Sequence, residues 1–112
     1  MPEPLPLEQF RSSETALRFE GGDHGSTISF FITNHPPEAS VPLHRHPYEE
    51  TFIVQRGRAA FSVDGETIEV KGGEVIVIPS GAAHGFANIG EESLRLVSIH
   101  PADRVEQEWL EG

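Results

Sequence analysis

Residues 44–57 read HRHPYEETFIVQRG, and residues 73–88 read GEVIVIPSGAAHGFAN. In a β-strand, side chains two positions apart point to the same side, so His44 and His46 project together. Glu50 has the same parity and joins them if the strand continues after a slight distortion. Two imidazoles and one carboxylate on one strand face favour a divalent transition metal. The first segment therefore predicts a metal site on one face of a strand.

The remaining histidine of these two segments is His84, which follows a predicted turn at residues 79–81. Strand parity alone does not bring His84 to the others, because a turn breaks the alternation of sides. The paired histidines also fit a solvated strand end beside Pro47, and Glu49 and Glu50 also fit a surface charge pair. The residue pattern by itself leaves both interpretations open.

The rest of the chain has the pattern of an all-β protein. Asp64-Gly65 favours a two-residue hairpin turn of type I′, which needs positive φ at both central positions. Short strands separated by turns every eight to twelve residues are typical of a sandwich or barrel. The strands are expected within residues 26–33, 50–54, 59–63, 67–70, 74–78, 84–89 and 94–100. Residues 105–110 form the one stretch with a helical pattern, so the C-terminal tail is expected to be helical or extended.

The ends of the chain are expected outside the barrel. Residues 1–10 contain Pro2, Pro4 and Pro6 and predict an extended arm, which is either a loose tail or docked on a neighbouring copy. Residues 11–25 predict a turn-rich connector, so residues 1–25 would precede a single domain over 26–112. The apolar run at residues 75–78 predicts a strand covered on both faces. A homodimer is therefore expected.

Composition excludes several classes of protein. The chain has 112 residues, the size of one domain, and a formal net charge of −10, which argues against nucleic acid or an anionic membrane as a partner. Cysteine is absent, so disulfides, thiolate metal sites and cysteine nucleophiles are excluded. No stretch approaches the roughly 18 apolar residues of a membrane span, and the N-terminus lacks the pattern of a signal peptide. We expect a cytoplasmic protein.

The two quoted segments resemble the two sequence motifs of the cupin superfamily. The first has His-x-His, three residues, Glu, six residues and Gly. The second has Gly, five residues, Pro-x-Gly, two residues, His, three residues and Asn. The resemblance covers roughly residues 26–100 and is closest to small single-domain cupins. The first motif usually opens with glycine where this chain has Glu38, so we expect the loop there to follow a different path.

The resemblance implies an all-β double-stranded β-helix, the cupin jelly-roll barrel, with one metal inside it. His44, His46, Glu50 and His84 would be the ligands. These donors suit Fe(II), Mn(II), Ni(II), Co(II) or Zn(II) and leave coordination positions open for a small organic molecule. The expected function is a metalloenzyme, dioxygenase-like in the first instance. A metal-dependent isomerase or lyase and a non-catalytic ligand-binding module are the alternatives.

A few other residues are candidates for the pocket. Tyr48 and His100 are weak catalytic candidates, with packing at the rim and a surface position as their simpler interpretations. Asn88 either faces the pocket or, as we expect, bonds to the backbone. No cationic clamp for a phosphate or polycarboxylate substrate is evident, so a small neutral or aromatic ligand is expected. The aromatic side chains expected either to line the pocket or to belong to the plain core are Phe30, Phe52, Phe61 and Phe86.

Overall fold

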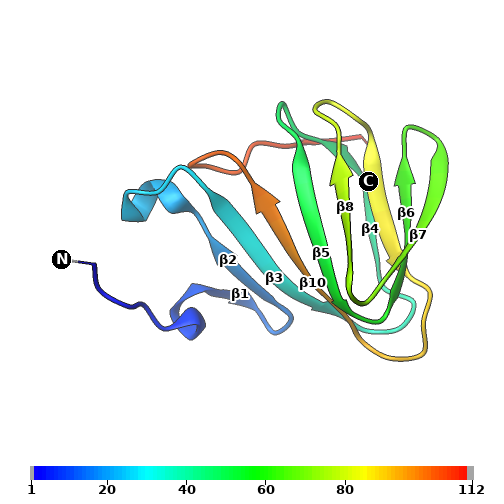
Figure 1. Cartoon of the computed structure of the whole chain (residues 1–112), viewed down its shortest axis with the longest axis horizontal. Helices are drawn as coiled ribbons and strands as arrows, with labels where there is room; N and C mark the ends of the chain where they lie inside the picture. Colours follow the sequence, from blue (N-terminus) through cyan, green and yellow to red (C-terminus); the bar gives the residue numbers. More distant parts are fainter. Residues whose placement is uncertain (1, 111–112) are drawn as a thin grey trace.

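Two antiparallel β-sheets pack against each other in the computed structural model, which describes residues 2–110 (Figure 1). The six-stranded sheet has the order β1 (Arg11–Ser13), β2 (Ala16–Phe19), β3 (Ser29–His35), β10 (Leu94–His100), β5 (Glu50–Arg56) and β8 (Glu74–Ile78). The five-stranded sheet has the order β11 (Glu108–Trp109), β4 (Ser40–Arg45), β9 (His84–Asn88), β6 (Arg58–Val63) and β7 (Glu66–Lys71). The all-β fold predicted from the spacing of the turns is confirmed.

The hydrophobic core lies between the inner faces of the two sheets. Its aromatic centre is formed by Phe52, Phe61 and Phe86, whose rings contact one another with centroids 4.9–5.7 Å apart. The remaining fully buried apolar side chains are Val54, Ala59, Val70, Ile78, Ala82, Leu94 and Leu96. Alternate residues of β5 and β6 face inward, which places Phe52, Val54, Ala59 and Phe61 in this core.

The hairpin between β6 and β7 is the predicted type I′ turn. Asp64 has φ 47° and Gly65 has φ 86°, so both central positions lie in the left-handed region. The amide of Asp64 donates to the carbonyl of Ala83 at 2.8 Å, and the amide of Ala83 donates to Oδ1 of Asp64 at 2.9 Å. The turn therefore fixes the start of β9, where His84 lies.

In the loop before β4, the residue at the position where the cupin motif usually has glycine adopts a left-handed conformation. Glu38 has φ 71°, a conformation that glycine adopts without steric cost. The amide of Ala39 donates to the carbonyl of Pro36 at 3.1 Å and closes the turn. Glu38 therefore occupies a glycine-like conformation, and the expectation of a different loop path is not supported at this residue.

The N-terminal segment differs from the predicted connector. Within residues 11–25, β1 and β2 extend the six-stranded sheet, because Leu17 and Phe19 of β2 pair with Ile32 and Phe30 of β3. These strands have only three and four residues, too few for a clear alternation in the sequence. Two 3₁₀-helices, η1 (Leu7–Phe10) and η2 (Gly21–His24), flank them. Division into arm and domain at residue 25 stays a prediction.

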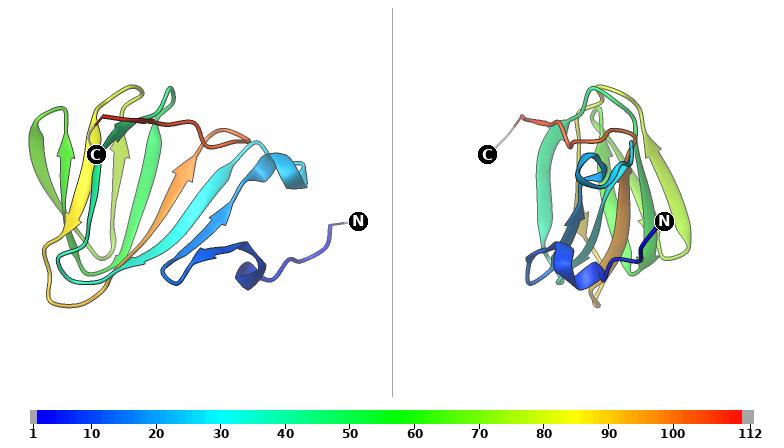
Figure 2. Two further views of the ribbon diagram at one scale, coloured as in Figure 1. Left: turned by 180° about the vertical axis from the view of Figure 1, so that it is seen from behind. Right: turned by 90° about the vertical axis from the view of Figure 1, so that its left-hand side faces the viewer.

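The C-terminal segment is extended, one of the two forms expected for it, and residues 105–110 contain no helix. β11 pairs with β4 and places Trp109 opposite His44. An ion pair between Arg45 and Glu108, with Nε and Oε1 2.7 Å apart, lies next to this pairing. The segment crosses from the six-stranded to the five-stranded sheet at one end of the sandwich (Figure 2).

Among the described residues, no helix is long and apolar enough to cross a membrane.

Part of the outer face of the six-stranded sheet carries no charged side chain. Two rows of paired residues cross β3, β10, β5 and β8 with side chains opposite to those in the core. We call these eight residues the outer patch: Ile32, Val97, Ile53 and Val75 in one row, and Phe30, Ile99, Thr51 and Val77 in the other. Val75 and Val77 are 59% and 57% exposed, whereas Ile78 is 1% exposed. Within a single chain, the run over residues 75–78 is therefore covered on one face only.

Candidate metal centre

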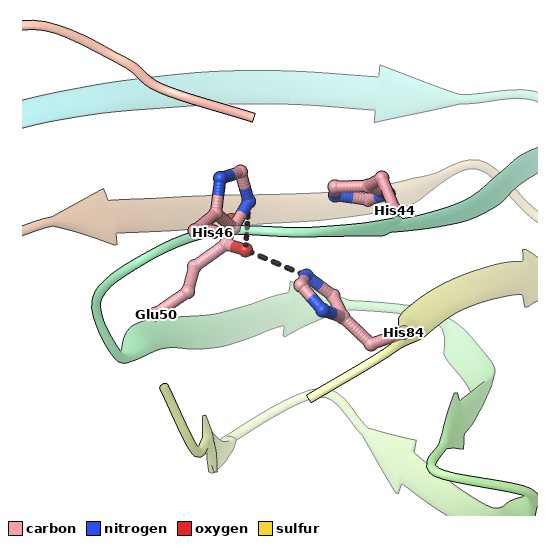
Figure 3. Close-up of side chains that lie close together, drawn as sticks. All are labelled: His44, His46, Glu50 and His84. Carbon is pink, nitrogen blue, oxygen red and sulfur yellow. Dashed lines mark hydrogen bonds and ion pairs between the residues drawn. The ribbon is translucent and has the colours of Figure 1, made fainter. Parts of the chain in front are cut away.

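Three histidines and one glutamate converge between the sheets at one end of the sandwich (Figure 3). His44 lies on β4, His46 follows that strand, Glu50 begins β5 and His84 begins β9. All four residues are buried, with exposed fractions of 5%, 3%, 3% and 1%. One potential ligand atom from each lies within 4.8 Å of the others. The structure thus brings together the four residues selected from the sequence.

Strand pairing explains why His84 joins the other three. β4 pairs with β9 so that His44 and His84 are direct partners across the ladder. The turn at residues 79–81 is held against the first segment, because the amide of Gly81 donates to the carbonyl of His46 at 2.9 Å. The Ser80 hydroxyl also donates to the carbonyl of Pro47 at 3.0 Å. These contacts supply the link that strand parity could not.

Each of the three histidines is oriented by a backbone carbonyl. Nδ1 of His44 lies 2.9 Å from the carbonyl oxygen of Pro42, and Nδ1 of His84 lies 2.9 Å from that of Ala82. Nδ1 of His46 lies 2.7 Å from the carbonyl oxygen of Glu106. A carbonyl only accepts, so Nδ1 carries the proton in each ring. In the neutral imidazoles the lone pair is therefore on Nε2.

The carboxylate of Glu50 lies among these Nε2 atoms. Its Oε1 is 3.0 Å from Nε2 of His46 and 2.9 Å from Nε2 of His84. The contact between His46 and Glu50 lacks hydrogen-bond geometry. Among the described residues, Nε2 of His46 is the one buried side-chain nitrogen or oxygen atom without a hydrogen bond. Lone pairs of neutral imidazoles and a carboxylate repel one another unless a cation lies between them. The arrangement therefore calls for protons or a metal ion.

The pKa values of the cluster follow from this crowding. Burial would raise the pKa of Glu50, but the close approach of the His100, His46 and His84 imidazoles holds it well below its usual range. Burial lowers the pKa of His46, but the contact with Glu50 and the hydrogen bond to the carbonyl of Glu106 together outweigh this, so the pKa is raised. Burial lowers the pKa of His44. Glu50 is thus an ionised carboxylate at neutral pH.

Tyr48 and His100 form a second layer beside the cluster. Nε2 of His100 lies 3.2 Å from Oε2 of Glu50, and Nδ1 of His100 lies 2.8 Å from the hydroxyl of Tyr48. A carboxylate only accepts, so Nε2 of His100 carries the proton and Nδ1 accepts from the tyrosine. His100 therefore has the opposite tautomer to the three clustered histidines. It is 1% exposed, so the surface position that we considered simpler is wrong.

A cavity of about 280 Å³ opens beside the cluster. Its polar lining includes His44, His46, Glu50 and His100. The other side chains that line it are Ala16, Arg18, Phe31, Thr33, His35, Val41, Phe52, Phe86, Leu96, Ser98, Gln107 and Trp109. The cavity therefore combines a polar end with largely apolar walls.

The cavity separates the four aromatic residues singled out in the sequence and corrects the placement of Phe30. Phe52 and Phe86 line it as expected, but Phe61 is fully buried in the core. Phe30 points to the outer face, and its neighbour Phe31 lines the cavity instead. Both faces of β3 carry apolar residues, so alternation did not show which face is the inner one.

Two residues that line the cavity were missed from the sequence. Arg18 comes from β2, the strand next to the edge strand β1 of the six-stranded sheet, and Trp109 comes from β11, an edge strand of the five-stranded sheet. The Trp109 ring lies 5.0 Å from the His44 ring. The only signal for Arg18 was its place in the alternation of residues 16–19, which is too short to interpret alone.

Asn88 has a structural role. Its Nδ2 donates to the carbonyls of His35 at 3.0 Å and Glu92 at 2.9 Å, while its Oδ1 accepts from the amide of Gly90 at 2.9 Å. All three partners are backbone groups. The expectation that Asn88 bonds to the backbone is confirmed.

Fold and site together define a class of β-sandwich protein with a buried cluster of histidine and glutamate. The sequence model of the Cupin domain matches residues 31–100, so this chain belongs to the cupin family. The predicted double-stranded β-helix of the cupins is thereby confirmed. The matched region contains all four clustered residues and His100 but excludes Arg18 and Trp109.

Curated relatives match this chain over part of their length. The chain is 37% identical over 62 residues to a protein named polyketide synthase CurC from Streptomyces cyaneus, covering 54% of this chain and 40% of the relative. It is 36% identical over 83 residues to an uncharacterized protein from Methanocaldococcus jannaschii, covering 66% of each chain. The chain thus spans between two fifths and two thirds of the length of these relatives.

Solved structures show the same fold. Oxalate decarboxylase from Bacillus subtilis, a protein with Mn(II) centres, superposes with a TM-score of 0.77 and 26% sequence identity. The match covers 88% of this chain and 29% of that chain. A metal-containing cupin enzyme is therefore among the proteins similar to this one.

Proposed function

We propose that His44, His46, Glu50 and His84 hold one divalent transition metal. The observation that carries this proposal is the convergence of three Nε2 atoms and a carboxylate, with Nε2 of His46 left without a hydrogen bond. Two ligands about 2.1 Å from an ion and at right angles lie about 3 Å apart. The separations of 2.9 and 3.0 Å from Glu50 to the two imidazoles match that spacing.

The donor set narrows the choice of metal. Three imidazoles and one carboxylate suit Fe(II), Mn(II), Ni(II), Co(II) or Zn(II), and the absence of thiolates disfavours softer ions. The similarity to the Mn(II)-containing oxalate decarboxylase makes Mn(II) the first ion to test, with Fe(II) second. Four protein ligands leave two positions of an octahedral site, and the cavity lies beside them.

The proposed function is a metalloenzyme that acts on a small organic molecule, with a dioxygenase-like reaction first among the candidates. When bound, a redox-active ion would supply a site where substrate and oxygen meet. The chain's own residues orient the ligands through Pro42, Ala82 and Glu106 and hold the Glu50 carboxylate through His100. The apolar walls exclude water from the reacting groups.

Metal content is the primary test. Protein purified without added metal and without nickel chromatography is expected to contain about one transition-metal ion per chain by mass spectrometry of the elements. Glu50→Gln and His84→Ala are expected to lose most of that metal, whereas His24→Gln, which alters an exposed histidine, retains it. Equal metal content in all four proteins would rule the site out.

Reactivity separates the three functions. Oxygen consumption with the iron-loaded protein across catechols, diketones and flavonols supports the dioxygenase. Turnover without oxygen consumption supports the isomerase or lyase. Stoichiometric binding without turnover supports a ligand-binding module, a role that the cupin fold permits because fold alone does not fix activity.

We also propose that a second copy of this chain covers the outer patch. None of the eight residues is charged, although the chain carries a net charge of −10, so this face avoids the repulsion that acid-rich surfaces impose on two copies. An isologous contact places the same patch on both sides and buries no unpaired charge. The exposed Val75 and Val77 at the edge strand would gain the cover that the sequence predicts.

A further inference from the structure

Arg18 is the one lysine or arginine among the residues that line the cavity. It lies on β2 directly opposite Phe31 of β3, and Phe31 is in turn opposite Ser98 of β10. The guanidinium carbon is 5.4 Å from the centroid of the Phe31 ring, within the range of a cation–π contact. Arg18, Phe31 and Ser98 therefore form a row across β2, β3 and β10 that lines the cavity, and Arg18 supplies its positive charge.

The hydrogen-bonding capacity of Arg18 is largely unused within the described residues. Its single ion-pair contact joins Nη2 to Oε1 of Glu20 at 3.5 Å, and no hydrogen bond of its guanidinium is present there. By contrast, Arg45, Arg58 and Arg104 each donate to a surface carboxylate at 2.6–3.0 Å. A guanidinium carries five N–H donors, so Arg18 retains donors for a ligand.

The opposite end of the same cavity holds the clustered histidines and Glu50. Glu50 begins β5, three strands from β2 in the order β2, β3, β10 and β5, so the backbones of β2 and β5 are about 14–15 Å apart at the usual strand spacing. Between these ends the walls are apolar, with Phe31, Phe52 and Phe86 among them. The cavity of about 280 Å³ is just below the range of about 300–1,000 Å³ typical of drug-sized ligands.

We propose that Arg18 selects a small organic anion, a carboxylate on an apolar and preferably aromatic body, whose other end faces the metal cluster. This inference rests on the proposed function only for the contact between the far end of the ligand and the metal cluster. A guanidinium binds a carboxylate through two parallel hydrogen bonds, which a neutral amide cannot reproduce. Arg18 lies outside the residues matched by the family's sequence model, so the selectivity belongs to this chain's N-terminal strands.

Binding of defined probes tests the proposal. Benzoate and phenylacetate, each paired with its neutral amide, are titrated into the full chain and followed by isothermal calorimetry and by chemical shifts of Phe31 and Trp109. The acids are expected to bind, and to bind at least about tenfold more tightly than the amides. Arg18→Gln is expected to weaken acid binding about 10- to 100-fold, the effect of losing hydrogen bonds to a charged group, and to leave amide binding unchanged.

Two further variants complete the test. Arg18→Lys is expected to bind the acids with intermediate affinity, because an ammonium keeps the charge but loses the paired donors. Arg95→Gln removes an exposed arginine that donates to Gln55 outside the cavity and is expected to bind like the unaltered chain. Equal acid binding by the unaltered chain and Arg18→Gln, a preference for the amides, or no acid binding at all would each overturn the proposal.

Metal content is measured on the same samples to separate this inference from the proposed function. Arg18→Gln is expected to retain the metal of the unaltered chain, because Arg18 contacts none of the four clustered residues. A chain that lacks metal yet discriminates acids from amides through Arg18 would refute the metal site and support the anion selectivity. A metal-loaded chain without that discrimination would do the reverse.

Discussion

Nε2 of His100 lies 3.2 Å from Oε2 of Glu50, while Oε1 of the same carboxylate faces Nε2 of His46 and His84. The carboxylate is therefore shared between a hydrogen-bond donor on one oxygen and the proposed ligands on the other. His100 is held in turn by the hydroxyl of Tyr48, which accepts from the amide of Glu106 at 3.2 Å. Burial raises the pKa of Tyr48, so its hydroxyl keeps the proton that it donates to His100.

This relationship predicts that His100 positions Glu50. His100→Ala is expected to weaken metal binding about 10- to 100-fold, the usual effect of removing a group that orients a metal ligand. Tyr48→Phe removes only the outer hydrogen bond and is expected to have a smaller effect. Competition titration of the metal-free protein with a fluorescent chelator measures both affinities. Unchanged affinity in His100→Ala would show that Glu50 is oriented without it.

Asn88 predicts a stability effect without a direct effect on the metal. Asn88→Ala leaves the carbonyls of His35 and Glu92 and the amide of Gly90 without their partner and is expected to lower the free energy of unfolding by about 2–3 kcal/mol. Urea unfolding followed by tryptophan fluorescence measures the change. Asn88→Asp is the matched variant, because it keeps the size but turns a donor toward the two carbonyls into an acceptor. A loss below about 0.5 kcal/mol in both variants would contradict the bonding seen here.

The parts of the fold and site predictable from sequence are those with local signals. Strand parity grouped His44, His46 and Glu50, but the single strand that it assumed is wrong, because β4 ends at Arg45 and Glu50 begins β5 in the other sheet. Asp64-Gly65 defined its turn through the φ values that it needs. His84 required the motif resemblance, because it joins the cluster through the pairing of β4 with β9 rather than through its neighbours. Long-range register has no signature in a single short segment.

The positions of the remaining site residues are set by strand order and tertiary pairing, which the local sequence pattern does not reveal. His100 stands before Pro101 like a strand end at the surface, yet its strand is central in the sheet and its ring is buried. Phe30 and Phe31 are both aromatic, so their sequence does not reveal which faces the cavity. Arg18 and Trp109 lie on strands of four and two residues that are stabilised by tertiary pairing.

His35 predicts a pH dependence that is independent of the metal ligands. Burial lowers the pKa of His35, whose Nε2 lies 2.8 Å from Oγ1 of Thr33 and whose ring contacts Phe86. Between this lowered pKa and the ordinary value of about 6.5, the unfolded chain binds more protons than the folded chain. The contribution of His35 to stability is therefore present above about pH 6.5 and is lost as pH falls through its folded pKa.

Nuclear magnetic resonance of the metal-free protein measures this directly. The imidazole of His35, assigned by comparison with His35→Gln, is expected to titrate below pH 6.5. The difference in the free energy of unfolding between the unaltered chain and His35→Gln is expected to shift against the unaltered chain as pH is lowered from 7.5 to 5.5. Titration of His35 at or above 6.5 would contradict the effect of burial.

The outer patch predicts that two copies of the chain assemble into a dimer. The chain has a mass of 12.3 kDa and is expected to sediment at twice that mass at micromolar concentrations. Val75→Glu combined with Val77→Glu introduces carboxylates into the patch and is expected to give monomers, because each dimer would bury four unpaired charges. Ile89→Glu is the control, since Ile89 is 43% exposed but lies outside the patch. It is expected to remain dimeric, and a monomeric unaltered chain would show that the patch serves another purpose.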